Sequence, residues 1–342
     1  MTIKCLAAGE VGGELHDFAY EPAQLNPLDI EIAISHCGVC HTDIHIIDNE
    51  DEASTYPLVP GHEIVGSITK KGSQVRGLEI GQRVGVGIQR STCLECEFCR
   101  RGDEQFCADL QLICRGHYGG YGEAIRTDSR FAFPIPEALS SENAATLLCA
   151  GITVYSPLRH LEIQPGQRVG VIGIGGLGHL ALQFARAWGC EVTAFSSSAD
   201  KEEEAREFGA SHFSSSVDAN AAVEESASHD LIISTVHASL DWEAYVKMLR
   251  PYGKLCFVGA IFAEPIRVFT DSLIWGCRMI CGSLVGNRSG MHEMLDFAAR
   301  HGIEAKTEVV PMSEANAAIE KVRSNRARYR MVLRNSVSEA GD

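Results

Sequence analysis

Four cysteines close together in the sequence form the first pattern that could do chemistry. Cys93, Cys96, Cys99 and Cys107 follow the spacing C-x2-C-x2-C-x7-C. Four thiolates can close a tetrahedral shell around one zinc ion, which leaves no position open for a substrate. An iron–sulfur cluster is the competing use, but in that run the fourth cysteine usually follows after three residues and precedes a proline. The spacing therefore predicts a structural zinc site that holds a loop together.

A second group of possible metal ligands and proton carriers lies in SHCGVCHTDIH, residues 35–45. Cys37 and Cys40 form a C-x-x-C there, which indicates either a redox pair or half of a metal site. The other candidates in this stretch and further along the chain are His41, His45, His62, Glu63 and Cys149. Because a buried cysteine is often only a small apolar side chain, these residues by themselves do not show which ones bind metal.

A glycine-rich turn predicts a nucleotide site. Gly173, Gly175 and Gly178 form G-x-G-x-x-G between an expected strand, 168–174, and an expected helix, 176–188. In this context the glycines allow a tight turn and let the backbone approach a pyrophosphate at the helix N-terminus. A glycine turn used only for packing is the alternative.

The end of the next expected strand, 191–196, indicates which dinucleotide binds. An NAD site usually carries an acidic residue there, which accepts a hydrogen bond from the ribose 2′-hydroxyl. This chain instead has Ser196, Ser197 and Ser198, with Lys201 just beyond. Hydroxyls can donate to a 2′-phosphate and an ammonium can pair with it, so the pattern favours NADP(H) over NAD.

Two kinds of secondary structure must position these residues. The first 130 or so residues contain short β-branched runs at 30–35, 63–69 and 83–88, separated by glycine and proline turns, which predicts a mainly β domain. Residues 142–158 are apolar at helical spacing and lead into a second domain.

The second domain alternates expected strands with helices, and its strands are almost continuously apolar. Such a pattern indicates a parallel sheet covered on both faces, the doubly wound Rossmann type of α/β fold. A helix is expected at about 200–208, and further strands at 212–215, 230–236, 254–260 and around 279–281. After a helix at 291–301, a last strand at 328–334 is expected to return to the first domain.

Composition excludes several classes of partner. The formal net charge is −15, which disfavours nucleic acid and anionic membrane surfaces. No run approaches the roughly 18 apolar residues of a membrane span, and the N-terminus lacks the apolar core of a secretory signal. We therefore expect a cytoplasmic protein in which the thirteen cysteines stay reduced.

In its order of motifs the chain resembles the zinc-dependent medium-chain dehydrogenase/reductase family, in particular its cinnamyl alcohol dehydrogenase-like branch and the bacterial NADPH-dependent aldehyde reductases within it. The motifs cover nearly the whole chain. They are GVCHTDIH (38–45), PGHEIVG (60–66), the four-cysteine lobe (93–107), LLCAGITVYSPL (147–158), GIGGLGH (173–179), AFSS (194–197), STV (234–236), SLDW (239–242), PMS (311–313) and ARYRMVL (327–333).

The resemblance implies a role for each residue of a catalytic zinc site. Cys40, His62 and Cys149 would bind a second zinc, and Glu63 would lie beside the metal and replace departing water. Asp43 would fix the ligand histidine, Thr42 would hydrogen-bond the substrate oxygen, and His45 would end a proton relay to solvent. Cys37 would then be a spectator, so the C-x-x-C would not act as a pair.

The resemblance also implies a GroES-like catalytic domain, 1–150 completed by 286–342, and a Rossmann NADP-binding domain, 151–285. Homodimers formed through the Rossmann domain are common in the family. The expected cofactor contacts are Thr153, Gly173, Gly175, Gly176, Leu177, Gly178, Ser196, Ser197, Ser198, Lys201, Thr235, Val236, Val258, Gly259 and Arg330.

One position departs from the bacterial relatives, several of which carry a tryptophan in an N-E-W motif before the Y-P of the substrate loop. Here the stretch reads DNEDEASTYP, so Asp51 stands in its place. If that loop lines the substrate pocket, the pocket loses an aromatic wall and gains a negative charge. Substrate preference is therefore not transferable from those relatives.

The expected activity is reversible hydride transfer from NADPH to an aldehyde, giving a primary alcohol. Two zinc ions and NADP(H) are the expected cofactors. An NAD-dependent alcohol dehydrogenase of the same fold is the nearer alternative. A non-catalytic protein that binds zinc and a nucleotide is the more distant one, and it would hold one zinc per chain rather than two.

Overall fold

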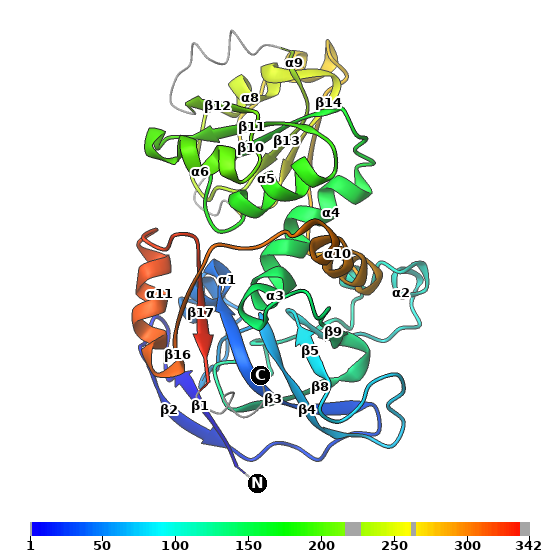
Figure 1. Ribbon diagram of the computed structural model, residues 1–342, viewed down its shortest axis with the longest axis vertical. Helices are drawn as coiled ribbons and strands as arrows, with labels where there is room; N and C mark the ends of the chain where they lie inside the picture. The colour runs from blue at the N-terminus through cyan, green and yellow to red at the C-terminus, as the bar shows by residue number, and fades with distance from the viewer. Residues whose placement is uncertain (1, 216–226, 261–264, 336–342) are drawn as a thin grey trace. The chain divides into compact units, whose positions relative to one another are not determined.

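The computed structural model describes residues 2–215, 227–260 and 265–335, so the last seven residues of the chain lie outside the description. Within it the chain forms two compact units (Figure 1). Unit 1 comprises residues 1–149 and 286–342, and unit 2 comprises residues 150–285.

Unit 1 is built on a seven-stranded sheet in the order β16-β17-β3-β4-β5-β9, with β8 pairing onto β3. Its strands are short, apart from β3, and are separated by long loops that carry most of the candidate ligands. The strands of unit 1 are β1 (Ile3–Ala8), β2 (Leu15–Tyr20), β3 (Asp29–Val39), β4 (Ile64–Lys71), β5 (Arg83–Val86), β6 (Gln89–Ser91), β7 (Gln111–Leu112), β8 (Ala124–Asp128), β9 (Phe133–Pro134), β16 (Thr307–Pro311) and β17 (Arg330–Arg334).

The C-terminal segment completes this sheet. β17 pairs antiparallel with β3, with Met331 opposite Val39, so segments about 290 residues apart lie side by side (Figure 1). The return of the last strand to the first domain is therefore confirmed. Isoleucines of β3, α1 and β4 that are at most 1% exposed form the centre of the core, and each contributes roughly 1.5–3 kcal/mol by its burial.

Short helices link the strands of unit 1. They are α1 (His41–Ile47), α2 (Glu97–Arg101), α3 (Ser141–Thr146), α10 (Arg288–His301) and α11 (Ala315–Arg323), with 3-10 turns η1 (Glu104–Phe106), η2 (Ser129–Phe131) and η5 (Met312–Glu314). The expected helix over 142–158 is interrupted. A π-helical turn, η3 (Leu147–Gly151), separates α3 from α4 (Ile152–His160). Such turns often occur at functional sites, and this one carries Cys149.

Unit 2 is a six-stranded parallel sheet in the order β12-β11-β10-β13-β14-β15. Counted from β10 as the first strand, this order is 3-2-1-4-5-6, which is the strand order of the Rossmann fold. The sheet therefore confirms the predicted fold class. The strands are β10 (Arg168–Ile172), β11 (Glu191–Ser196), β12 (His212–Ser215), β13 (His229–Ser234), β14 (Leu249–Phe257) and β15 (Met279–Gly282).

Helices lie on both faces of this sheet: in Figure 1, α5 and α6 lie below the strands and α8 and α9 above them. Coverage on both faces explains why the central strands are almost entirely apolar. The helices and turns after α4 are α5 (Gly178–Ala187), η4 (Ala199–Lys201), α6 (Glu202–Glu207), α8 (Trp242–Met248) and α9 (Thr270–Ile274). No helix among the described residues is both long and apolar enough to cross a membrane.

Candidate active site

Four potential metal ligands from distant parts of the sequence meet in unit 1. The ligand atoms of Cys40, His62, Glu63 and Cys149 all lie within 4.8 Å of one another. Cys40 stands between the end of β3 and the start of α1, and the π-helical turn supplies Cys149. His62 and Glu63 directly precede β4 and are fully buried. The structure thus selects these four from the wider set of candidates.

Asp43 fixes the orientation of the histidine ligand. Its Oδ1 lies 2.9 Å from His62 Nδ1, and the same oxygen accepts a hydrogen bond from the Gly61 amide at 2.9 Å. Its Oδ2 accepts from the Cys40 amide at 3.0 Å. A proton held on Nδ1 leaves the lone pair of Nε2, which lies 3.4 Å from Cys149 Sγ, for a metal. The buried carboxylate therefore presets the tautomer that coordination needs.

The two carboxylate oxygens of Glu63 have different surroundings. Its Oε1 accepts an ion-paired hydrogen bond from Arg330 Nη2. Its Oε2 is buried and has no hydrogen-bond partner among the described residues. Burial raises the pKa of Glu63 to about 7, although the positive charge of Arg330 acts in the opposite direction. An unsatisfied buried carboxylate oxygen beside two thiols and an imidazole fits a site built for a cation.

One of the two thiols of this site is prepared for ligation, whereas its hydrogen bond with Cys40 and its burial raise the pKa of Cys149. A hydrogen bond from the Cys149 thiol, together with the neighbouring His62, holds the pKa of Cys40 well below its ordinary value. Since thiolates rather than thiols bind metals, the environment of Cys40 favours the form that a zinc ion would take up. Two thiolates and one imidazole leave a fourth position for Glu63 or another oxygen.

The predicted proton-transfer residues lie on α1 next to this site. Thr42 Oγ1 accepts from Cys40 Sγ at 3.7 Å. His45 Nδ1 lies 2.6 Å from a carboxylate oxygen of Glu50, a residue that sequence reasoning did not single out. The turn after α1 brings the His45 and Glu50 side chains together. In this turn the Glu50 amide donates to the His45 carbonyl at 3.1 Å. A lone acidic residue five positions after a histidine gives no sequence signal of this contact.

The four cysteines of the lobe meet as predicted. Their sulfurs lie within 4.8 Å of one another, with Cys107 Sγ 3.5 Å and Cys99 Sγ 3.9 Å from Cys93 Sγ. Backbone amides of Glu95 and Cys96 donate to Cys93 Sγ at 3.4 and 3.3 Å. These amide donors lower the pKa of Cys93 to about 7. The group brings four sulfurs together, and Cys99 Sγ also donates to Thr92 Oγ1 at 3.5 Å.

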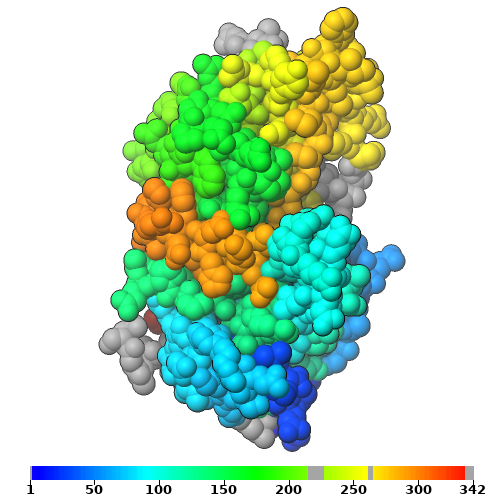
Figure 2. Space-filling view, turned by 90° about the vertical axis from the view of Figure 1, so that its right-hand side faces the viewer, coloured from blue at the N-terminus to red at the C-terminus, as the bar shows by residue number. Residues whose placement is uncertain are grey.

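The lobe is attached to the rest of unit 1 by a buried carboxylate. Glu104, whose side chain is 3% exposed, accepts from Arg288 Nε at 2.7 Å at the start of α10. Figure 2 shows the lobe (cyan) as a rounded protrusion beside α10 (orange). Its position at the surface explains why a local cluster of ligands, rather than an apolar core, has to hold this loop.

In unit 2 the glycine turn takes the geometry of a nucleotide cradle. A Cβ on Gly178 would come within 1.8 Å of the Gly173 carbonyl oxygen, so only glycine allows α5 to begin so close to β10. A Cβ on Gly175 would meet nothing within 4 Å, which leaves room for a ligand to approach the backbone. Thr235 Oγ1 secures the turn by donating to the carbonyls of Ile172 at 2.9 Å and Gly173 at 3.0 Å.

Apart from Thr153, the remaining expected cofactor residues of unit 2 lie at or just after the carboxyl ends of its strands, where open α/β sheets bind ligands. Lys201 Nζ donates to the Ile174 carbonyl at 2.8 Å, which brings its charge to the glycine turn. Ser196 Oγ accepts from the Ser198 amide at 3.2 Å and is buried, whereas Ser197 is exposed. Val236 follows β13, and Val258 and Gly259 follow β14, while Thr153 is buried on α4.

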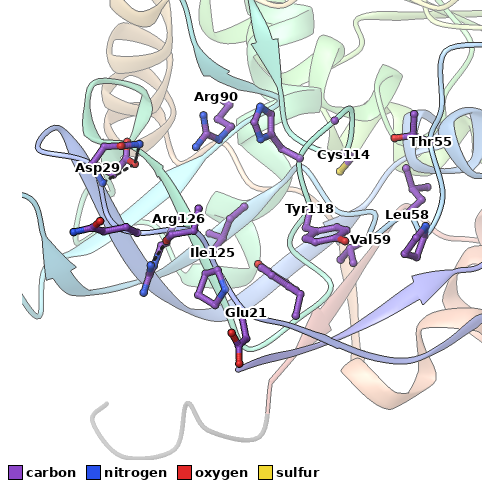
Figure 3. Close-up of a pocket in the computed structure, with 18 of the residues that line it drawn as sticks. Glu21, Asp29, Thr55, Leu58, Val59, Arg90, Cys114, Tyr118, Ile125 and Arg126 are labelled. Carbon is purple, nitrogen blue, oxygen red and sulfur yellow. Dashed lines mark hydrogen bonds between the residues drawn. The ribbon is translucent and has the colours of Figure 1, made fainter. Parts of the chain in front are cut away.

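A pocket of about 440 Å³ lies in unit 1 (Figure 3). It reaches Cys114, whose sulfur lies within 4.8 Å of ligand atoms of Asp43 and His62. Several of its charged groups already have partners: Arg126 pairs with Glu31, and Asp29 accepts from Asn26 at 2.7 Å. Among the described residues, none of Cys40, His62, Glu63 and Cys149 lines this pocket, which approaches the candidate active site only through Cys114.

Comparison with known proteins decides the family. The model of the alcohol dehydrogenase GroES-like domain matches residues 26–137, and that of the zinc-binding dehydrogenases matches residues 176–300. The aldehyde reductase AdhA of Synechocystis sp. is 43% identical over 98% of this chain and 99% of its own length. This chain belongs to the zinc-binding alcohol dehydrogenase family.

Solved structures of this dehydrogenase family agree with the fold. A cinnamyl alcohol dehydrogenase of Sorghum bicolor superimposes with a TM-score of 0.94 at 38% identity, covering 100% of this chain and 99% of its own. The cinnamyl alcohol dehydrogenase of Helicobacter pylori, solved with NADP(H), gives a TM-score of 0.91 at 32% identity, with 98% of each chain covered. Membership of a zinc-binding family favours zinc over an iron–sulfur cluster at the four-cysteine lobe.

Two expectations about this dehydrogenase change in detail. Arg330 was expected at the cofactor; the structure places it against Glu63, and its contact with the cofactor stays a prediction. Asp51 was expected to add a negative charge to the substrate pocket if its loop lines that pocket. Arg115 in fact binds the Asp51 carboxylate through both terminal nitrogens, with Nη1 at 3.1 Å from Oδ1, so the charge is paired. No pattern in the sequence predicts this partner, because it lies 64 residues away.

Proposed function

We propose that the protein catalyses reversible reduction of aldehydes to primary alcohols with NADPH. The observation that carries the proposal is the meeting of Cys40, His62 and Cys149, with Asp43 fixing the imidazole, in a family of zinc-binding dehydrogenases. Unit 1 would be the GroES-like catalytic domain and unit 2 the NADP-binding domain. The relatives named aldehyde reductase and cinnamyl alcohol dehydrogenase support this choice of substrate class.

Cys40, His62 and Cys149 would hold the catalytic zinc, and the four lobe cysteines the structural one. When bound, the catalytic zinc supplies a Lewis acid that polarises a carbonyl, and the nicotinamide supplies the hydride. Two thiolates balance the charge of the dication, and Asp43 keeps the proton of His62 on Nδ1. Glu63, held by Arg330 through one oxygen, presents its other oxygen to the same space and can occupy a vacated ligand position.

The chain supplies its own route for the proton. We assign Thr42 the hydrogen bond to the substrate oxygen and His45 the transfer to solvent. Glu50 lies 2.6 Å from His45 Nδ1 and its side chain is 37% exposed, so it can hold the ring and exchange protons with water. The relay therefore comprises one hydroxyl, one imidazole and one carboxylate between positions 42 and 50.

NADP(H) is the proposed cofactor because the residues at the end of β11 and just beyond it carry hydroxyls and a positive charge rather than a carboxylate. Lys201 is anchored beside the glycine turn, and Ser197 and Ser198 precede it. Lys201→Ala should raise the KM for NADPH about 10- to 100-fold, the value of a charge-assisted contact, and leave the KM for NADH nearly unchanged. Equal effects on both cofactors would favour the NAD-dependent alternative.

The decisive experiment for the activity is a panel of aromatic and aliphatic aldehydes assayed with NADPH and NADH on protein of measured zinc content. The proposal predicts oxidation of NADPH with at least one aldehyde and two zinc ions per chain. One zinc per chain, with no oxidation of either cofactor, would support the non-catalytic zinc and nucleotide-binding protein.

We also propose a homodimer that assembles through unit 2. Seven of the twelve exposed large apolar side chains among the described residues lie between positions 252 and 284, and Trp275 is 88% exposed. The outermost strand β15 lies within this segment, and an uncovered sheet edge with apolar neighbours favours pairing with another chain. Trp275→Asp should shift the mass in light scattering from dimer to monomer, whereas Val11→Asp should not.

We place the protein in the cytoplasm. All thirteen cysteines are free, and the two candidate metal sites need eight side chains, six of them thiols, in reduced form. Fractionation of cells with an antibody against the native protein would test this, and a periplasmic or secreted pool would contradict it.

A further inference from the structure

The pocket of unit 1 in Figure 3 has the size of a small-molecule site, although the proposed reaction does not use it. Its volume of about 440 Å³ falls within the roughly 300–1,000 Å³ of pockets that hold small ligands. Most of its lining comes from three parts of the chain, within 20–29, 55–59 and 114–118. The charges and rings of this lining indicate which class of ligand would fit.

One end of the pocket carries a positive charge that no carboxylate neutralises. Arg90 donates through Nη1 to Gln111 Oε1 at 2.9 Å and has no acidic partner in the part of the chain that the structure describes, which leaves its Nε and Nη2 edge for a ligand. His117 also lines the pocket, and its burial and the neighbouring charge of Arg90 lower its pKa, so at pH 7 it is a neutral imidazole with one N–H to donate. Glu21 lies at the opposite end of the lining from Arg90 (Figure 3). The Arg90 end therefore suits a carboxylate, which a guanidinium binds through two parallel hydrogen bonds.

The middle of the lining is aromatic and apolar. The ring centroids of Tyr20 and Tyr118 lie 4.4 Å apart, and Phe18 meets Tyr118 edge to face at 5.6 Å. These contacts hold the Tyr118 ring in place. Leu58 and Val59, both buried, add aliphatic side chains to the same lining. A flat aromatic ring can pack against such a surface.

We propose that this pocket binds a small aromatic carboxylate. The carboxylate lies against the Nε and Nη2 edge of Arg90, and the ring packs on Tyr118, Leu58 and Val59. An inorganic anion lacks the ring, and a neutral aromatic compound lacks the charge, so neither satisfies both parts of the lining.

A bound ligand would also contact a neighbour of the candidate zinc site. Cys114 lines the pocket, and its sulfur lies within 4.8 Å of ligand atoms of Asp43 and His62. Displacement of the imidazole from the position that Asp43 sets should lower kcat, whereas the KM for the aldehyde should stay the same because the ligand does not occupy the aldehyde site. This effect on catalysis rests on the proposed function, whereas the binding itself does not.

The test is isothermal titration calorimetry of the zinc-loaded protein with 4-bromobenzoate. The probes 4-bromobenzamide and inorganic phosphate lack the charge or the ring, and each should bind at least about tenfold more weakly. Arg90→Gln should weaken binding of 4-bromobenzoate about 10- to 100-fold, the value of a charge-assisted hydrogen bond. Arg76→Gln is the matched control and should bind as the wild type, since Arg76 is exposed and donates to the carbonyls of Ser73 and Val75.

A carboxylate can also bind a catalytic zinc, so a bromine anomalous map of a soaked crystal locates the ligand. The proposal predicts a peak beside Tyr118. A peak at the Cys40 site alone, or no binding at millimolar 4-bromobenzoate, would overturn it. So would equal affinities for 4-bromobenzoate and phosphate, or unchanged affinity in an Arg90→Gln protein whose thermal midpoint shows that it is folded.

Steady-state kinetics with 4-bromobenzoate give the effect on catalysis its own test. A fall in kcat at constant KM for the aldehyde is expected in the wild type and in Arg76→Gln, and it should be lost in Arg90→Gln at the same concentration. Unchanged kinetics in a protein that shows the bromine peak beside Tyr118 would remove the link to the zinc site and leave the binding site standing.

Discussion

The two metal sites of unit 1 use four ligands each, yet they are built in opposite ways. The lobe takes all of its ligands from residues 93–107, and two of its cysteines are partly exposed. The Cys40 site takes its ligands from three segments spread over 110 residues, and His62 and Glu63 within it are fully buried. A site whose ligands are local can hold a loop in place, whereas one that joins distant segments depends on the whole fold.

The two sites also differ in the chemical type of their metal ligands. Four thiolates would fill the shell of the lobe and give a complex with a zinc dication a net charge of −2, with no free position. At the Cys40 site two thiolates and an imidazole would leave a bound dication neutral, and the fourth position would be open to Glu63, which Arg330 also binds, or to another oxygen. Of the two residues outside the ligand set, Asp43 keeps the histidine in place, whereas Arg330 holds one oxygen of Glu63 and leaves the other without a partner among the described residues.

The largest expected effect separates the two cysteines of the C-x-x-C. Cys40→Ala should lose one zinc and lower kcat by at least about 10³-fold, because a Lewis acid contributes several kcal/mol to the transition state. Cys37→Ala should keep both zinc ions and most of the activity, since Cys37 is a fully buried core residue and not a ligand. Zinc analysis and steady-state kinetics measure both variants, and equal losses in the two would restore the paired-cysteine interpretation.

The second prediction concerns the four-cysteine lobe. Cys96→Ser should lose the other zinc and destabilise the lobe, since metal binding at such sites contributes directly to folding. We expect a clearly lower thermal midpoint, with kcat at 20 °C kept within about tenfold of the wild type because no lobe ligand touches the Cys40 site. Cys277→Ser is the control for loss of a thiol alone. A folded Cys96→Ser protein as inactive as Cys40→Ala would show that the two sites are not independent.

A smaller effect is expected at the end of the proton relay. Glu50→Gln removes the carboxylate 2.6 Å from His45 and should lower kcat about tenfold, less than the 10²–10⁴ of a group that transfers the proton directly. The KM for NADPH should stay the same, and the variant should keep both zinc ions. Glu52→Gln, two residues further along the same loop, should behave as the wild type. Matching kinetics in Glu50→Gln and Glu52→Gln would remove Glu50 from the relay.

The smallest effect should come from the ion pair that joins the two regions. Asp51 lies in the loop after α1, and its partner Arg115 follows the lobe. Arg115 holds the pKa of Asp51 below the ordinary value of 3.8, so the pair stabilises the fold above that pH and is lost as the pH falls through the lower folded value. Because Asp51 is 41% exposed, the contribution should be at most about 1 kcal/mol.

Asp51→Asn should therefore lower the free energy of unfolding at pH 7 by about 0.2–1 kcal/mol, and by less at pH 3. Urea titrations at the two pH values measure the difference. The substitution also leaves the Arg115 charge unpaired, so the ratio of kcat/KM between anionic and neutral aldehydes should rise a few-fold. A larger loss of stability at pH 3 than at pH 7 would contradict the assigned sign.

The same two regions show how far sequence can reach. The lobe was predictable, because four ligands at fixed short spacing leave almost no other arrangement. The Rossmann sheet was predictable too, since apolar strands alternating with helices and a glycine fingerprint constrain its topology. At the Cys40 site the residues alone gave seven candidates, and only resemblance to a family chose among them.

Other features depend on tertiary contacts that leave no local pattern. The interruption of the helix at Cys149 by a π-helical turn, the pairing of Arg330 with Glu63 across 267 residues, and the contacts Asp51–Arg115 and His45–Glu50 all follow from how loops meet. Helical periodicity cannot report a single inserted residue, and a charged side chain in a loop has many possible partners. These are also the contacts that distinguish the Cys40 site from the four-cysteine lobe.

The most direct test of the central claim is a crystallographic anomalous difference map at the zinc edge. The account predicts two peaks per chain: one surrounded by the sulfurs of Cys93, Cys96, Cys99 and Cys107, and one bound by Cys40, His62 and Cys149 with an oxygen as the fourth ligand. A single peak at the lobe, or a second peak bound by Cys37 in place of Cys149, would contradict it.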